Sequence, residues 1–227
     1  MSGTKLFIFS NEELPGYVGD HIKLVKYVSK NFRDQYRECL LQVPYEYILT
    51  FNDDYFLMGS PKYSEISGCI DVLANSKYSH IRFVRGPNFI APALLKNLYQ
   101  MNNTKPYFFS QTLSLWRRID LIRVFDAVGP SGIGRKGNEL QFENLANTAC
   151  RQLDLSGLVY IQNERKVGSA HYECNIIPHI VSAIVDGYWN TKEYANELAK
   201  IEHEFRVQLN PARYRPSLIS YLRKIFI

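Results

Sequence analysis

Residues 45–57 read YEYILTFNDDYFL, a β-branched and aromatic run that leads straight into an acidic triplet. The run over residues 45–51 predicts a buried strand, and Asn52, Asp53 and Asp54 follow it directly. Open α/β sheets bind ligands outside the carboxyl ends of their strands, so these side chains would lie at a ligand-binding edge. Two carboxylates at that edge suit Mg²⁺ or Mn²⁺, which take their remaining ligands from water and substrate phosphates.

An ordinary surface turn is the alternative for this triplet, because Asn and Asp are common turn residues. The segments on both sides of it are apolar, with Tyr55, Phe56 and Leu57 following the acidic residues. A charged pair between two apolar segments is costly unless it is ligated, so the flanking sequence favours the metal site.

Further strands and helices flank this segment. Asn31 is a suitable N-cap for a helix that ends before Pro44, while Ser60 and Pro61 have the residue types of an N-cap and a first helical position. The other expected elements are strands over residues 5–10, 79–85, 106–109 and 158–162, and helices over residues 118–128, 139–153, 194–207 and 218–226. Alternating strands and helices predict one α/β domain over residues 1–190, with a mixed, largely parallel sheet covered on both faces. Residues 191–227 would form a helical extension packed on that domain.

Composition and charge narrow the class of protein. The chain has 227 residues, of which 46% are hydrophobic, and a net charge of +5. This mild basic excess suits phosphate-bearing ligands or an anionic membrane surface. The basic residues are scattered except near the C-terminus, which argues against nucleic acid as a partner.

The four cysteines are far apart in the sequence and contain no C-x-x-C pair, which argues against a zinc cluster and predicts buried free thiols. The chain has neither a membrane-spanning run nor a signal sequence at its first residues, so a cytoplasmic location is expected.

A glycine-rich segment lies between two expected helices. Residues 132–137 read GIGRKG, which matches G-x-G-x-x-G, but the segment follows a helix rather than a strand, so it fails the structural test for a dinucleotide fingerprint. A lid that brings Arg135 and Lys136 over a phosphorylated donor is the functional interpretation, and a solvated loop is the alternative.

Three further side chains are candidates for a functional site. Glu143 lies in the first turns of the helix after this loop, as a general base or as a residue favoured there by the helix dipole. Trp116 precedes two arginines, as a ligand contact or as a hydrophobic anchor for the next helix. His171 is a candidate third metal ligand, or a hydrogen-bonded polar residue without a metal; His179 is a second histidine of this kind.

Taken together, these motifs resemble GT-A glycosyltransferases. The segment YILTFNDDYFL is similar to the strand and aspartate motif with which those enzymes hold a divalent ion against the donor diphosphate. Residues 109–118, FSQTLSLWRR, followed by Gln141-Phe142-Glu143, are similar to small transferases that build bacterial surface polysaccharides and the glycans of large DNA viruses. The late segment ending in VDGYW at Trp189 also resembles theirs, and the likeness spans roughly residues 45–190.

The resemblance implies transfer of a sugar from a nucleoside-diphosphate donor, UDP-sugars being favoured, to a glycan, lipid-linked or protein-linked acceptor. Asp54 would be the direct metal ligand, and Asp53 would share the metal or contact the sugar or ribose, with Asn52 beside it at the donor. Glu143 would deprotonate the acceptor hydroxyl in an inverting reaction, and would only position the substrate in a retaining one. A metal-dependent nucleotidyltransferase and a non-enzymatic carbohydrate-binding module are the alternatives.

The C-terminal segment combines cations with apolar residues. Its basic residues are Arg206, Arg213, Arg215, Arg223 and Lys224, and aliphatic and aromatic side chains lie between them. A terminal helix docked on the core is one interpretation. The other is a peripheral contact with an anionic membrane surface, which would suit a lipid-linked acceptor.

Overall fold

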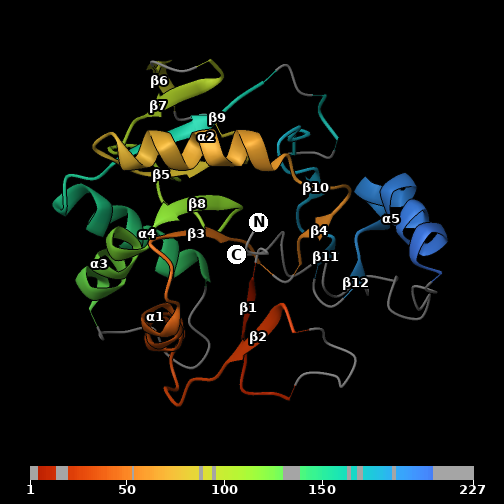
Figure 1. Ribbon diagram of the computed structural model, residues 1–227, viewed down its shortest axis with the longest axis horizontal. Coiled ribbons are helices and arrows are strands. Elements are labelled where there is room, and N and C mark those ends of the chain that lie inside the picture. The colour runs from red at the N-terminus through yellow and green to blue at the C-terminus, as the bar shows by residue number, and fades with distance from the viewer. Residues whose placement is uncertain are drawn as a thin grey trace, which may run out of the picture.

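The computed structural model describes residues 5–13, 20–52, 54–86, 89–93, 96–129, 139–162, 165–167, 171–185 and 188–206. Its centre is a six-stranded sheet with the order β3-β8-β5-β9-β7-β6 (Figure 1). The strands are β3 (Tyr47–Thr50), β5 (Tyr78–Arg82), β6 (Phe89–Pro92), β7 (Leu98–Met101), β8 (Ser114–Arg117) and β9 (Ser156–Tyr160). The chain is therefore an α/β protein, as the alternation of elements predicted.

The sheet is mixed, but the expectation that it is largely parallel is wrong. Among the described strands of this sheet, β5 and β9 form the only parallel pair, and β8 runs antiparallel to both of its neighbours, β3 and β5. The reason lies in residues 102–113, which run outside the sheet and return the chain to the edge at which β3 and β5 end. The next strand, β8, starts at that edge and has to run in the opposite direction.

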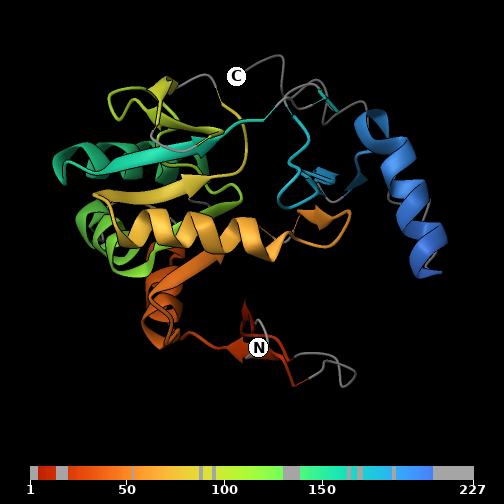
Figure 2. The ribbon, with the colours of Figure 1, turned by 45° about the horizontal axis from the view of Figure 1, so that its top comes forward.

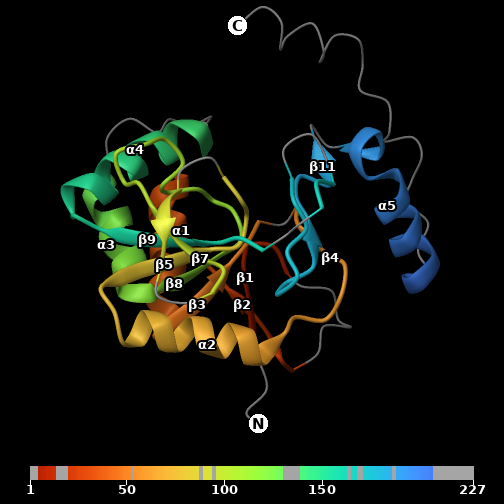
Figure 3. The ribbon, with the colours of Figure 1, turned by 90° about the horizontal axis from the view of Figure 1, so that it is seen from above.

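Helices cover both faces of the sheet (Figures 2 and 3). On one face α2 (Tyr63–Ala74) packs through Cys69 and Leu73 against Ile81, Leu115 and Leu158. The opposite face is covered by α1 (Phe32–Gln42), α3 (Arg118–Val128) and α4 (Glu139–Gln152). Successive residues of a strand point to opposite faces of the sheet, so alternate residues of each strand contribute to the hydrophobic core on each face.

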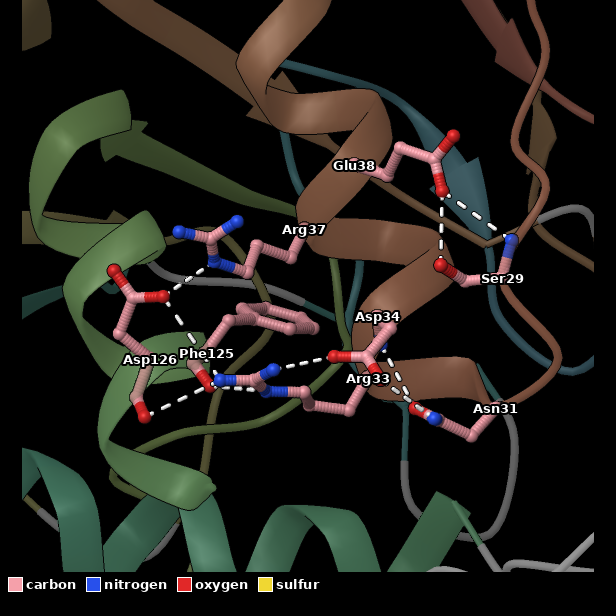
Figure 4. Close-up of polar contacts among 8 residues, drawn as sticks. All are labelled: Ser29, Asn31, Arg33, Asp34, Arg37, Glu38, Phe125 and Asp126. Carbon is pink, nitrogen blue, oxygen red and sulfur yellow. Dashed lines mark hydrogen bonds and ion pairs between the residues drawn. The ribbon is translucent and has the colours of Figure 1, made fainter. Parts of the chain in front are cut away.

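Helix α1 begins where its sequence predicts and is tied to α3 (Figure 4). The Asn31 side chain accepts a hydrogen bond of 2.9 Å from the Asp34 backbone N–H, which satisfies one of the free donors of the first turn. Arg33 donates from Nε to the Phe125 carbonyl at 2.6 Å, and Arg37 forms an ion pair with Asp126. These contacts fix the two helices against each other.

Two local expectations are corrected. Helix α2 starts at Tyr63 rather than after Ser60, because the Lys62 N–H is donated to the Ile176 carbonyl at 2.8 Å, which holds the preceding residues outside the helix. Residues 106–109 form turns instead of a strand, with Tyr107 in the left-handed region at φ 62°. Phe109 packs in the core beneath α4 and is 3% exposed. An apolar residue is therefore needed at this position although it is not part of a sheet.

Two smaller groups of elements lie beside the main sheet (Figure 1). In the first, strand β1 (Leu6–Phe9) pairs in parallel with β2 (Ile22–Val25). In the second, β4 (Phe56–Leu57) pairs with β10 (His179–Ile180), and β11 (Ile184–Val185) pairs with β12 (Tyr188–Trp189). Helix α5 (Thr191–Phe205) packs on this group through Tyr194, Leu198 and Ile201.

All four cysteines are buried and free, as predicted. Within the part of the chain that the structure describes, no helix has both the length and the apolar character needed to cross a membrane. The expected helix over residues 218–226 lies outside the described residues.

Candidate functional site

The candidate site lies at the edge of the sheet where β3 and β5 end. Thr50, the last residue of β3, pairs with Ser114 at the start of β8, and Ser114 also pairs with Arg82 at the end of β5. The turn that follows β3 is closed by a 3.2 Å hydrogen bond from the Tyr55 N–H to the Asn52 carbonyl. The acidic turn therefore does follow the carboxyl end of a strand, and Asp54 belongs to it; Asp53 lies outside the described residues.

Glu143 reaches the same edge from α4. Its Oε1 accepts two hydrogen bonds, from Ser110 Oγ at 3.1 Å and from the Gln111 N–H at 2.7 Å. Both donors belong to the segment that leads into β8. The carboxylate is half-buried, and Oε2 accepts no hydrogen bond from the residues that the structure describes. One oxygen is thus held by the protein, while the other remains available to a ligand.

Asn147, one turn further along α4, fixes this arrangement. Its Oδ1 accepts from the Phe109 N–H at 3.0 Å, and its Nδ2 donates back to the Phe109 carbonyl at 3.1 Å. Nδ2 also donates to the Glu143 carbonyl at 2.7 Å. The side-chain amide therefore pairs with both backbone groups of Phe109, which places Ser110 and Gln111 against Glu143.

Tyr55 connects the acidic turn to Glu143. Burial raises the pKa of its hydroxyl group, and the charges of Asp54 and Glu143 raise the pKa further, while Arg82 acts in the opposite direction. The phenol thus lies within electrostatic range of all three charged groups. Because the pKa is raised, the hydroxyl stays protonated and can donate a hydrogen bond at neutral pH.

Arg82 is a buried cation at this edge. Only 3% of its surface is exposed, and its Nη1 donates to the Tyr107 carbonyl. Burial lowers the pKa of the guanidinium to about 10, against an opposing contribution from Glu143, so the group is still charged at neutral pH. Gly86 packs directly on it, since a Cβ added at Gly86 would overlap Arg82 Nη2.

Trp116 lies in the core and not at the site. It is 2% exposed and stacks on His80 with ring centroids 4.1 Å apart. Its neighbours in the core include Phe109 and Phe125. This packing supports the hydrophobic-anchor interpretation over contact with a donor.

His171 and His179 form a buried pair close to Tyr55. The ring of His179 stacks on Tyr55 at 5.8 Å, and the two histidine rings are 5.0 Å apart. His171 Nε2 contacts the His179 carbonyl at 2.9 Å, and His179 Nδ1 contacts the Ile177 carbonyl at 2.6 Å. Burial lowers the pKa of both rings, that of His179 to about 4, so both are neutral at pH 7. Each ring thus makes one hydrogen bond, while His171 Nδ1 and His179 Nε2 are buried without a partner among the described residues.

Asp54 is the carboxylate of the acidic turn that the structure describes, and a divalent ion there would have to complete its coordination from other ligands. Among the described residues no three His, Cys, Asp or Glu side chains converge on one point that could hold a metal. Mg²⁺ and Mn²⁺ do not require such a cage, because they commonly bind through one or two carboxylates together with water and phosphate oxygens. Asp54, at the sheet edge, meets that requirement. Arg135 and Lys136, predicted to cover the donor, lie outside the described residues.

A cavity of about 390 Å³ adjoins His179 on the side of α5. Its lining combines aliphatic side chains with amides and charges, among them Met58, Asn175, Asn196 and Lys200. The volume is within the range of small-ligand sites.

Sequence reasoning missed Arg82, Asn147 and Tyr55. Arg82 had a signal, because it is a charged residue inside the otherwise apolar run HIRFV over residues 80–84. Asn147 had none, since an amide in an amphipathic helix gives no indication that it binds the backbone of a residue 38 positions away.

No family model matches the sequence, and no curated protein is similar to it. Among solved structures, the chain is similar to UDP-glucose pyrophosphorylase complexed with UDP-glucose, with 9% sequence identity and a TM-score of 0.40. The similarity covers 61% of this chain and 57% of that one, so the chain spans less than two thirds of that protein. A likeness at this level assigns neither a fold family nor a function.

Proposed function

We propose that this protein is a glycosyltransferase that moves a sugar from a nucleoside-diphosphate sugar to a hydroxyl group of an acceptor. The observation that carries the proposal is the position of Glu143. Its carboxylate is held at the edge of the sheet where β3 ends in the acidic turn, with one oxygen fixed by Ser110 and Gln111. A base and an acidic diphosphate-binding turn at one sheet edge are what sugar transfer from such a donor requires.

Glu143 is the proposed general base of an inverting reaction. Oε1 is held by its two donors, so Oε2 accepts the proton of the acceptor hydroxyl. The acceptor oxygen forms a bond to the anomeric carbon as the bond from that carbon to the diphosphate oxygen breaks. The nucleoside diphosphate leaves with the electron pair, and the protonated Glu143 later returns its proton to solvent.

Asp54, with Asp53, is the proposed ligand of the Mg²⁺ or Mn²⁺ ion. A bound divalent ion neutralises the charge that develops on the departing diphosphate. Asn52 is proposed to contact the donor beside these carboxylates. Tyr55, whose hydroxyl remains protonated, can donate a hydrogen bond to an anionic oxygen of a ligand at this edge. Arg135 and Lys136 remain proposed donor contacts from the glycine-rich loop.

A thermal-shift screen of nucleoside-diphosphate sugars, with and without Mn²⁺, tests the function. We expect a UDP-sugar to raise the melting temperature only when the metal is present, and slow release of UDP to follow over hours. Metal-dependent stabilisation by nucleoside triphosphates with sugar phosphates would instead support a nucleotidyltransferase. Stabilisation by free glycans alone, unaffected by metal, would support a carbohydrate-binding module and contradict the proposal.

A further inference from the structure

Arg82 has donors that the fold does not use. Its Nε and Nη2 are buried and have no hydrogen-bond partner within the described ranges. Nearly all buried polar groups in proteins are hydrogen-bonded, and a buried charge without full pairing is costly. A purely structural arginine would therefore be expected to have its guanidinium satisfied.

Arg117, on the neighbouring strand, shows what a satisfied arginine looks like in this fold. Its guanidinium donates to Asp120 at 2.9 Å and to the Ser76 carbonyl at 3.2 Å, and it also donates to the Leu73 carbonyl. These partners fix the end of α2 against the start of α3. Arg82 has no comparable set, although it is the more deeply buried of the two.

Glu143 compensates the charge of Arg82 only in part. It is the carboxylate that acts on the guanidinium electrostatically, but no ion pair within 4.0 Å joins the two side chains. Glu143 Oε1 is instead occupied by Ser110 and Gln111. The positive charge is therefore left with unused hydrogen-bonding capacity.

Two further buried groups without hydrogen-bond partners among the described residues belong to the segment before β8, the strand that pairs with β5. Gln111 Nε2 and Thr112 Oγ1 are also buried without hydrogen-bond partners in the described part of the protein. They immediately precede β8, whose first residue, Ser114, pairs with Arg82. Three of these four atoms, counting Arg82 Nε and Nη2, are N–H donors, the kind of group that binds an oxygen-rich anion.

We propose that Arg82 binds the diphosphate of the donor through Nε and Nη2, which together form the planar fork that matches two oxygens of a phosphate. This assignment rests on the proposed function. Gly86 lies against Nη2, since a Cβ added there would overlap that atom, and a ligand that reaches Nη2 has to displace this segment. Glycine at position 86 leaves the room that the guanidinium occupies and that a side chain would fill.

Isothermal titration calorimetry in the presence of Mn²⁺ tests the assignment, with UDP, inorganic pyrophosphate and uridine as probes. We expect Arg82→Lys to bind UDP and pyrophosphate about 10- to 100-fold more weakly, because it loses the bidentate contact. Uridine, which carries no phosphate, should bind the variant as it binds the wild type. Arg117→Lys is the matched control, which should retain the wild-type affinity for UDP even where its melting temperature falls.

Gly86→Ala provides a second variant that keeps the arginine but displaces it, and it should weaken UDP binding in the same way. Hydrogen exchange of the wild type gives a readout that needs no variant, since amides of residues 83–86 should change their protection when UDP is added. Unchanged UDP affinity in both variants would overturn the role of Arg82 while leaving the proposed function intact. Binding of pyrophosphate but not UDP by the wild type, lost in Arg82→Lys, would support Arg82 and contradict the nucleotide donor. Failure of the wild type to bind either anion would contradict both.

Discussion

Asn147 should be one of the residues on which the stability of the protein most depends. Its side-chain amide makes two hydrogen bonds with the backbone of Phe109, at 3.0 and 3.1 Å, in a region where Phe109 is 3% exposed. Replacing Asn147 with Ala removes both and leaves a buried backbone N–H without its partner. Leaving the buried Phe109 N–H unsatisfied costs about 1–3 kcal/mol, and loss of the second hydrogen bond costs about 1 kcal/mol, so a loss of about 2–4 kcal/mol is expected.

Urea denaturation followed by circular dichroism measures this loss. For a chain of this size the same change corresponds to a fall in melting temperature of about 5–15 °C. Asn147→Asp should be about as destabilising at neutral pH, because it places a carboxylate oxygen where the Asn147 Nδ2 donates to the Phe109 and Glu143 carbonyls. Thr148→Ala is the control on the same helix, since among the described residues its exposed hydroxyl bonds only within the helix, to the Asn144 carbonyl at 3.3 Å and from Arg151 Nη2 at 3.2 Å. It should change stability by less than about 0.5 kcal/mol.

A loss below about 1 kcal/mol in Asn147→Ala would refute the reasoning, because it would mean that another group satisfies the Phe109 backbone. The same variant also bears on the site. Residues 110 and 111 would no longer be held against Glu143, so turnover should fall together with stability. Activity equal to that of the wild type in a destabilised variant would show that the Glu143 carboxylate is positioned independently of Asn147.

Four further predictions concern Asp54, Glu143, His179 and the C-terminal basic segment. Asp54→Ala should abolish Mn²⁺-dependent transfer or donor hydrolysis with the circular dichroism spectrum unchanged, and full activity in the variant or in excess chelator would exclude the metal mechanism. Glu143→Gln should lower turnover by about 10²–10⁴-fold while donor binding persists, and near-normal turnover would rule out Glu143 as the base. Burial lowers the pKa of His179 from 6.5 to about 4, so the contribution of its neutral ring to stability is complete above pH 6.5 and is lost as the pH falls towards 4. The urea midpoint of the wild type should therefore fall over that pH range, and that of His179→Gln should fall less steeply. An identical pH dependence of the midpoint in both proteins would contradict this. If the C-terminal basic segment contacts membranes, the protein should co-sediment with anionic liposomes at low salt and be released at high salt, whereas absence from the pellet at low salt would favour a docked terminal helix.

The sequence predicts elements well where local signals agree with packing. Helix α3 has the predicted bounds, and α1 has its predicted cap at Asn31 and buries Cys39 and Leu40 as its apolar stripe requires. The positions of the acidic turn after β3 and of Glu143 in the first turns of α4 were predicted because strand ends and helix starts are visible in local patterns.

Features set by distant contacts were not predicted. Strand β8 is only four residues long and joins α3 directly, so its apolar residues read as the approach to a helix. Phe108 and Phe109 suggested a strand, although core packing and Asn147 hold them in a turn. Arg82 and Tyr55 gain their importance from residues of α4 and the 107–111 segment, a proximity that no local pattern contains.

The placement of β8 and β9 constrains the order in which the protein can fold. Thr50 Oγ1 donates to the Ser114 carbonyl across 64 residues, and Ser79 Oγ donates to the Ser156 carbonyl across 77 residues. During synthesis β3 therefore has no neighbour in the sheet until β8 emerges from the ribosome. Strand β5 pairs with β8 on one side and has no neighbour on the opposite side until β9 follows. Pairings of such long range form slowly and leave strand edges exposed in the meantime. A chain truncated before residue 156 would retain α1, α2 and α3 but not the strand that joins the two halves of the sheet, and should aggregate rather than fold.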